Sequence, residues 1–130
     1  MMIVVAIVGI LAAVAIPSYR QHVEKGRIAA ATGLLAESKV RMEQIFNSNR
    51  SYEIEPNKCL DLTATFADSK FTPTVTCSAS GFTISISGTA GGPMVGFSYS
   101  INQAGEKFST TPDSGGEKAC WLRARGTNAC

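Results

Sequence analysis

The sequence predicts an α+β fold in which one long N-terminal helix, apolar in its first half and amphipathic in its second, packs on an antiparallel meander sheet of about four strands. Two observations indicate this fold. The first sixteen residues carry no charge and no side chain that can hydrogen-bond, and about thirty residues with a helical pattern follow them. Further along the chain, apolar and polar residues alternate as they do in half-buried strands.

Length and charge set the limits of the organisation. The 130 residues allow one domain beside the apolar segment, and 12 basic against 10 acidic side chains give a net charge of +2. That balance by itself indicates neither nucleic acid nor anionic lipid as a partner. We expect residues 1–21 to form a membrane or assembly helix and residues 22–130 a globular head. The head would comprise the amphipathic half of the helix, a connector over 48–73, a sheet over 74–111 and a C-terminal loop over 112–130.

Two interpretations of the apolar segment fit it poorly. A cleaved signal peptide has a basic start and a small-residue cleavage site; Ala13-Val14-Ala15 resembles such a site, but no basic residue precedes it and Pro17 follows closely. A plain membrane anchor needs roughly 17–25 apolar residues, and sixteen fall just short. A third interpretation comes from the order of the residues and is given below.

From Ser18 to about Asn47 the apolar positions narrow to one stripe at helical spacing, which predicts a helix face that covers a sheet rather than a cofactor site. Poor helix formers, Asn47-Ser48-Asn49, end the pattern. His22 is the only histidine and is expected to be a solvated or inter-subunit polar residue, not a catalytic one. The stripe consists of Ile28, Ala31, Leu35, Met42 and Ile45, broadened by Leu34 and Phe46.

Residues 51–73 read as a turn-rich connector with small apolar anchors, and strands are expected after it. A sheet with one polar and one apolar face needs a cover, which the helix stripe supplies. The anchors are Leu60, Leu62 and Phe66. Strands are predicted around Val75 and Cys77, over 82–87, over 95–101 and over 107–110. The inward residues are Phe82, Ile84 and Ile86 in the second strand and Val95, Phe97, Tyr99 and Ile101 in the third.

The four cysteines, Cys59, Cys77, Cys120 and Cys130, form no CxxC motif and have no nearby histidine, which argues against zinc. An even number behind an export-type apolar segment favours disulfides in an oxidising compartment. Three pairings are possible. We favour Cys59–Cys77 with Cys120–Cys130, because local loops close at the least entropic cost.

The stretch MIVVAIVGILAAVAIPSYRQ, Met2 to Gln21, closely resembles the N-terminal helix of the type IV pilin family. Gly9 and Pro17 match the two helix-weakening positions of that family, and Ser18-Tyr19 follows as its aromatic residue usually does. Gly and Pro lower helix stability by about 1 and 3 kcal/mol, so both would let the helix bend or melt locally. Pilins also have a short basic leader ending in Gly, a methylated Phe and a nearby Glu, which we expect upstream of Met1.

The resemblance implies a long helix on an antiparallel sheet and a disulfide-bounded C-terminal loop exposed on a filament. It implies a chain that sits in the inner membrane of a Gram-negative bacterium before assembly and then polymerises with other pilin subunits into an extracellular pilus. It implies no enzyme activity, cofactor, metal or small-molecule substrate.

The C-terminal loop is the candidate partner-binding surface. It combines one aromatic and three cationic side chains, Lys118, Trp121, Arg123 and Arg125. Arginine neutralises phosphate and an aromatic ring stacks on a base, and some minor pilins bind DNA during uptake. The alternative is that Trp121 packs under the sheet edge and the arginines are ordinary solvated side chains.

Three functions therefore remain open. The leading one is a structural pilus subunit that serves adhesion, twitching motility or DNA uptake. The second is a minor pilin that binds DNA or a host surface through the C-terminal loop, and the third is a type II secretion pseudopilin, which the disulfide-tied tail disfavours. An enzyme is not indicated, because the sequence has no nucleophile–base pattern, and the Gly-rich turn at 88–93 lacks the Lys and Ser/Thr of a phosphate-binding loop.

Overall fold

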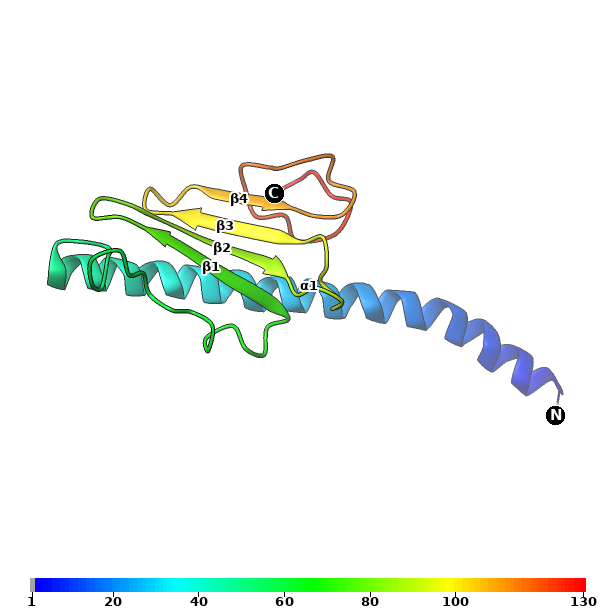
Figure 1. Cartoon of the computed structure of the whole chain (residues 1–130). Coiled ribbons are helices and arrows are strands. Elements are labelled where there is room, and N and C mark those ends of the chain that lie inside the picture. The colour runs from blue at the N-terminus through cyan, green and yellow to red at the C-terminus, as the bar shows by residue number, and fades with distance from the viewer. Residues whose placement is uncertain (1) are drawn as a thin grey trace.

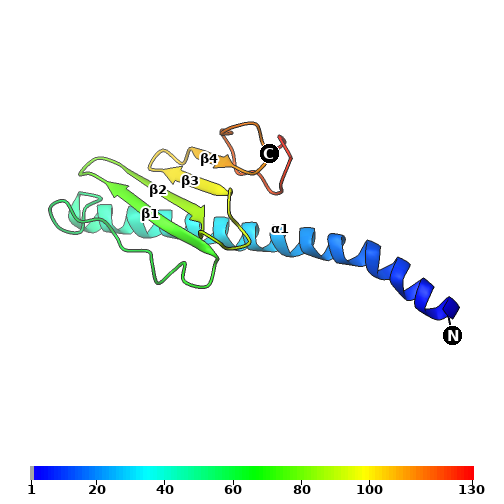
Figure 2. The same cartoon turned by 45° about the vertical axis from the view of Figure 1, so that its right-hand side comes forward.

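The computed structural model describes residues 2–130, and within them it contains one helix and four strands (Figure 1). The strands form an antiparallel meander in the order β1-β2-β3-β4, which lies against the C-terminal half of the helix, while the N-terminal half projects from the head in both views (Figures 1 and 2). The predicted α+β fold is confirmed. The elements are α1 (Met2–Asn49), β1 (Phe71–Cys77), β2 (Phe82–Gly88), β3 (Ser98–Asn102) and β4 (Lys107–Thr110).

Helix α1 is unbroken through Gly9 and Pro17 and curves over its N-terminal part (Figure 1). Its large apolar side chains between Met2 and Ile16 are 52–90% exposed, and the helix is long and apolar enough to cross a membrane. It ends two residues later than predicted. Arg50 has a φ of 57° and donates its N–H to the carbonyl of Phe46 at 2.7 Å, which closes the last turn in the left-handed conformation common at helix ends.

The core lies between the predicted helix stripe and the inner face of the sheet. The stripe also contains the fully buried Ser38. Its hydroxyl can be buried at little cost, because its Oγ donates to the carbonyl of Leu34 at 2.7 Å within the helix. The inner face of the sheet repeats every second residue, as predicted. Buried are Ile28, Ala31, Leu35 and Met42 of α1, Phe82, Ile84 and Ile86 of β2, and Tyr99 and Ile101 of β3.

The sheet begins at Phe71, three residues before the predicted start at 74. The prediction was wrong because Pro73 interrupts the run, and a proline removes one ladder hydrogen bond. In the structure Pro73 belongs to β1 and lies opposite Ile86 of β2. Because β1 is an edge strand, it tolerates the proline. The connector before it contributes Tyr52, Leu62 and Phe66 to the core, while Leu60 is half-buried.

The predicted strand over 95–101 is wrong at its start, since β3 begins at Ser98. A turn precedes it, in which Phe97 donates its N–H to the carbonyl of Met94 at 3.1 Å and Gly96 has a φ of 87°. Val95, predicted to point inward, is 49% exposed, and Met94 is buried in its place. This turn packs so closely on the end of β2 that a Cβ at Gly88 would overlap the carbonyl of Met94.

The two disulfides are the pairs that local loop closure favours. Cys59 is joined to Cys77 with a Cα–Cα distance of 5.7 Å, and Cys120 is joined to Cys130 with a Cα–Cα distance of 6.0 Å. The first bond fixes the connector to the end of β1. The second closes the C-terminal loop on itself.

Candidate functional site

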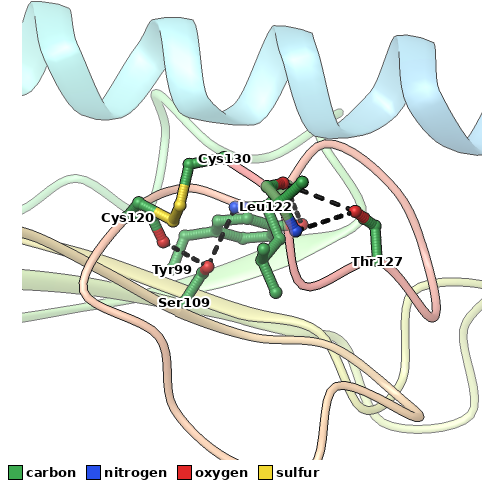
Figure 3. The surroundings of a disulfide bond; sticks show 7 residues. Tyr99, Ser109, Cys120, Leu122, Thr127 and Cys130 are labelled. Atoms are coloured by element: carbon green, nitrogen blue, oxygen red, sulfur yellow. Dashed lines mark hydrogen bonds between the residues drawn. A yellow bond between two sulfur atoms is a disulfide. The ribbon is translucent and has the colours of Figure 1, made fainter.

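Residues 120–122, where the disulfide-bounded part of the C-terminal loop begins, are fixed to the sheet by a short chain of hydrogen bonds (Figure 3). Ser109 of β4 donates its hydroxyl to the carbonyl of Cys120 and accepts the N–H of Leu122 at 3.0 Å. Tyr99 of β3 donates its hydroxyl to the carbonyl of Leu122, also at 3.0 Å. Leu122 and Tyr99 are both buried, so these bonds are shielded from water and hold residues 120–122 in one place.

The hydroxyl of Tyr99 stays protonated in this setting. Burial, with a smaller contribution from the carboxylate of Glu24, raises the pKa of Tyr99 above its ordinary value of 10.0. The phenol is therefore a dependable donor to Leu122 at neutral pH.

The rest of the disulfide-bounded part, residues 123–130, returns toward α1. Arg125 lies 3.4 Å from a carboxylate oxygen of Glu24, and its guanidinium also lies 5.2 Å from the centre of the Phe97 ring. Thr127 accepts the N–H of Ala129 at 3.1 Å, which turns the chain so that Cys130 reaches Cys120 (Figure 3). The loop thus bridges the sheet and the helix.

Trp121 is half-buried and makes two contacts within the chain, one through its indole N–H and one through its ring. Its Nε1–H donates to the carbonyl of Ser100 at 2.9 Å, and Nζ of Lys107 lies 4.6 Å from the centre of its ring. A cation over an aromatic face is attracted by the ring quadrupole. The ring packs at the sheet edge with Lys107 beside it, and its predicted role as a stacking surface for a base stays a prediction.

A groove of about 740 Å³ separates the C-terminal loop from α1. Its helix wall includes a row of small residues, Ala29, Gly33 and Ala36, which lie three and four residues apart on one flank of α1. Lys25, Ile28 and Thr32 complete this wall. The opposite wall is formed by the loop, with Trp121, Leu122 and the Cys120–Cys130 disulfide. The small residues leave the groove open, because a Cβ at Gly33 would meet nothing within 4 Å.

Three cations line this groove: Lys25 of α1, Lys107 of β4 and Arg123 of the loop. Among residues 2–130, none of the three forms an ion pair, and no Asp or Glu lines the groove. Lys25 and Arg123 are exposed at its rim. The groove is therefore a site of positive potential whose charges are free to meet an anion.

The structure brings together only part of the predicted site. Trp121 and Arg123 line the groove, whereas Arg125 is engaged with Glu24, and Lys118 lies aside, its backbone paired with Ser109. Sequence reasoning missed Lys25 and Lys107. Lys107 had no detectable signal, because Phe108 is the apolar residue of this strand and alternation would turn it, not Lys107, inward; the structure places Lys107 opposite Ile101. Lys25 had none, because only the fold places it beside the loop.

Within the part of the chain that the structure describes, no group of three His, Cys, Asp or Glu side chains is placed to hold a metal ion. The groove offers positive charge, hydrogen-bond donors and an apolar floor. These can bind an anion.

A helix that lies half under a four-stranded antiparallel sheet and extends for a membrane-length apolar stretch beyond it is the architecture of type IV pilins. The model of the family described as type IV minor pilin ComP, DNA uptake sequence receptor, matches residues 17–96, more than half of the chain. The chain belongs to this family. Comparisons with curated proteins and with solved structures give no match.

The matched residues contain the amphipathic part of α1 and strands β1 and β2, and they end before β3. Of the three groove cations, Lys25 lies within the match, and Lys107 and Arg123 lie beyond it. The loop wall of the groove is therefore a feature that this structure adds to the family assignment.

Proposed function

We propose that this chain is a minor subunit of a type IV pilus and that it binds DNA through the groove between α1 and the C-terminal loop. The observation that carries the proposal is the set of three cations without carboxylate partners, Lys25, Lys107 and Arg123, around one groove. Membership of a family described as a DNA uptake sequence receptor supports a nucleic acid as the anion.

Assembly rests on the other half of the molecule. The apolar side chains between Met2 and Ile16 are exposed in the single chain, and burial of each larger one is worth roughly 1.5–3 kcal/mol. Before assembly a bilayer provides that burial, and in a filament the helices of neighbouring subunits provide it. Gly9 and Pro17 fit this change of surroundings, because both weaken the helix that must make it.

The groove fits the backbone of DNA better than its bases. Lysine and arginine neutralise phosphates and release their counterions, whereas sequence is read at base edges. Small helix residues along one wall let a phosphodiester strand approach closely, and Lys107 is held in place over Trp121 at 4.6 Å. A fixed cation loses less side-chain freedom on binding than a mobile one.

The test is fluorescence anisotropy of a labelled 30-base-pair duplex with the full chain in neutral dodecyl maltoside micelles. Three phosphate contacts predict a slope of log K against log salt of about −2.7, so affinity should fall about 40-fold between 50 and 200 mM salt. The triple variant Lys25→Gln, Lys107→Gln, Arg123→Gln should bind at least about tenfold more weakly and with a shallower salt slope.

The matched control removes the same charge elsewhere, with Arg50→Gln, Lys58→Gln and Lys70→Gln, none of which lines the groove. This control should keep most of the affinity. Equal losses in the two triple variants would mean that only net charge matters and would refute the groove as the site. A wild-type chain that does not bind the duplex would refute the DNA function itself.

A further inference from the structure

A second cavity, of about 340 Å³, lies on the other flank of α1, between the helix and the loop that joins β2 to β3. Its helix residues are 19, 20, 23, 24 and 27, whereas those of the groove are 25, 28, 29, 32, 33 and 36. At about 100° per residue, from 3.6 residues per turn, these two sets lie on opposite sides of the core stripe. The cavity is lined by Tyr19, Arg20, Val23, Arg27, Pro93 and Met94, together with Glu24.

Two arginines dominate this cavity. Arg20 is exposed and Arg27 is half-buried, and over residues 2–130 neither forms an ion pair. The single carboxylate that lines the cavity, Glu24, is directed to Arg125 of the C-terminal loop at 3.4 Å. Neither guanidinium therefore has its charge compensated by a carboxylate at ion-pair distance among residues 2–130. The cavity therefore presents two guanidinium groups that an anion from outside the chain could meet.

The cavity lies directly above the apolar half of α1. At 1.5 Å per residue, Tyr19 and Arg20 are about 5–6 Å past Ile16 along the helix axis, and Arg27 is about 16 Å past it. Long side chains on a helix lean back toward its N-terminus, so both guanidinium groups approach the apolar segment. When that segment is in a bilayer with Ile16 at the edge of the hydrocarbon core, Tyr19 and Arg20 are in the headgroup layer, which is about 5–8 Å thick on each side. Arg27 begins beyond that layer and its side chain leans back toward it.

We propose that this cavity binds the headgroup phosphate of an anionic phospholipid and so fixes the depth of α1 in the membrane before assembly. A guanidinium matches phosphate through two parallel hydrogen bonds, and Arg20 and Arg27 supply two such groups seven residues, about two helical turns, apart. Tyr19, 70% exposed, adds an amphipathic ring at the membrane–water interface, where tyrosine is enriched.

The position of the cavity next to the apolar segment of α1 favours a lipid headgroup over other anions as its ligand. Before assembly, a DNA duplex that reached Arg20 would have to lie against the bilayer surface, whose anionic headgroups repel it, whereas the groove begins at Lys25 and extends to Ala36, farther from the apolar segment. A headgroup is already at that level and needs no further approach. The two flanks of α1 are thereby assigned different ligands, a membrane phosphate on one side and a DNA phosphate on the other.

The test uses the full chain reconstituted in phosphatidylcholine vesicles with a trace of spin-labelled phosphatidylglycerol or spin-labelled phosphatidylcholine. Electron paramagnetic resonance gives the fraction of each labelled lipid that the protein holds immobile. The wild-type chain should prefer phosphatidylglycerol on the order of fivefold, as expected for a cation that acts at the membrane surface. The variant Arg20→Gln, Arg27→Gln should lose most of that preference, while circular dichroism and both disulfides remain unchanged.

The matched control is Lys25→Gln, Arg123→Gln, which removes two nearby charges from the groove and should keep the lipid preference. No preference in the wild-type chain would overturn the proposal, and so would an equal loss in the two double variants, because diffuse charge would then explain it. Loss of duplex binding in Arg20→Gln, Arg27→Gln with an unchanged lipid preference would also overturn it and would assign the cavity to DNA. The outcome is independent of the DNA site, since the wild-type lipid preference is measured without DNA.

Discussion

At the scale of single residues, the C-terminal loop depends on Tyr99. This side chain belongs to the core on one side, and its hydroxyl donates to the buried carbonyl of Leu122 on the other. Removing the hydroxyl would leave that carbonyl without its tyrosine donor, and an unsatisfied buried acceptor costs about 1–3 kcal/mol. Tyr99→Phe should therefore lower the free energy of unfolding by that amount, as measured by urea denaturation at neutral pH.

The same residue predicts how stability depends on pH. The pKa of Tyr99 is raised above 10.0 in the folded chain, chiefly by burial and then by Glu24, so its contribution is complete below pH 10 and is lost as pH rises toward the folded pKa. We expect up to about 1 kcal/mol of stability to be lost between pH 9 and 11 for this one group. Urea titrations at both pH values should show a smaller loss in Tyr99→Phe than in the wild-type chain. An equal loss in both chains would contradict this prediction.

Residue types alone revealed part of the site and not the rest. Trp121 and Arg123 were identifiable because a tryptophan and several cations gather in a short disulfide-bounded segment. Lys25 and the small residues beside it on α1 were not, because their role depends on a loop about 100 positions away. Tyr99 was correctly expected to point inward, but no pattern in the sequence indicates that its hydroxyl meets Leu122.

At the scale of elements, patterns with a strong period were predicted well and those near turns were not. The alternation in β2 and most of the helix stripe are buried as expected, because each period fits one geometry, while Leu34, Ile45 and Phe46 of the stripe are partly buried against the core. Val95 shows the limit: it continues the alternation of Phe97 and Tyr99, but the turn at Met94–Gly96 points it to solvent. Pro73 shows the converse, since an edge strand accepts a residue that normally ends a strand.

The Cys120–Cys130 bond is the element that fixes the second half of the loop. It closes a loop with a sequence separation of 10, and the chain-entropy relation gives about 3 kcal/mol for a loop of that size. Cys120→Ser, Cys130→Ser should lose stability of that order in urea denaturation. Hydrogen exchange should rise over residues 123–130 and stay slow at Leu122, whose N–H and carbonyl are held by Ser109 and Tyr99.

The loop variant also tests the groove, because Arg123 lies in the released part. Duplex affinity should fall in parallel with the faster exchange. Cys59→Ser, Cys77→Ser serves as the control, since that bond fixes the connector and does not line the groove. If exchange over 123–130 stays slow without the Cys120–Cys130 bond, then Arg125 and the Thr127 turn hold the loop by themselves.

At the scale of the whole molecule, the chain divides into a head that buries its apolar surface and a helix half that exposes it. Burial in the core begins at Ile28, and from Met2 to Ile16 every large apolar side chain is at least 52% exposed. The two parts are joined by one continuous helix and share no core. Charge follows the same division, because Arg20, Arg27, Lys25 and Arg123 gather where the head meets the apolar segment.

This division predicts that removing residues 1–21 leaves the head intact. The side chains of residues 2–21 are all exposed in the single chain, so their loss takes little from its folding free energy, whereas it removes the surface that drives association. Residues 22–130 should be a soluble monomer by sedimentation equilibrium, with a thermal midpoint within a few degrees of that of the full chain in micelles. The full chain should associate when the detergent is withdrawn. A fragment that is insoluble, or that melts ten degrees lower, would show that the helix stabilises the head through contacts beyond those at Ile28 and onward.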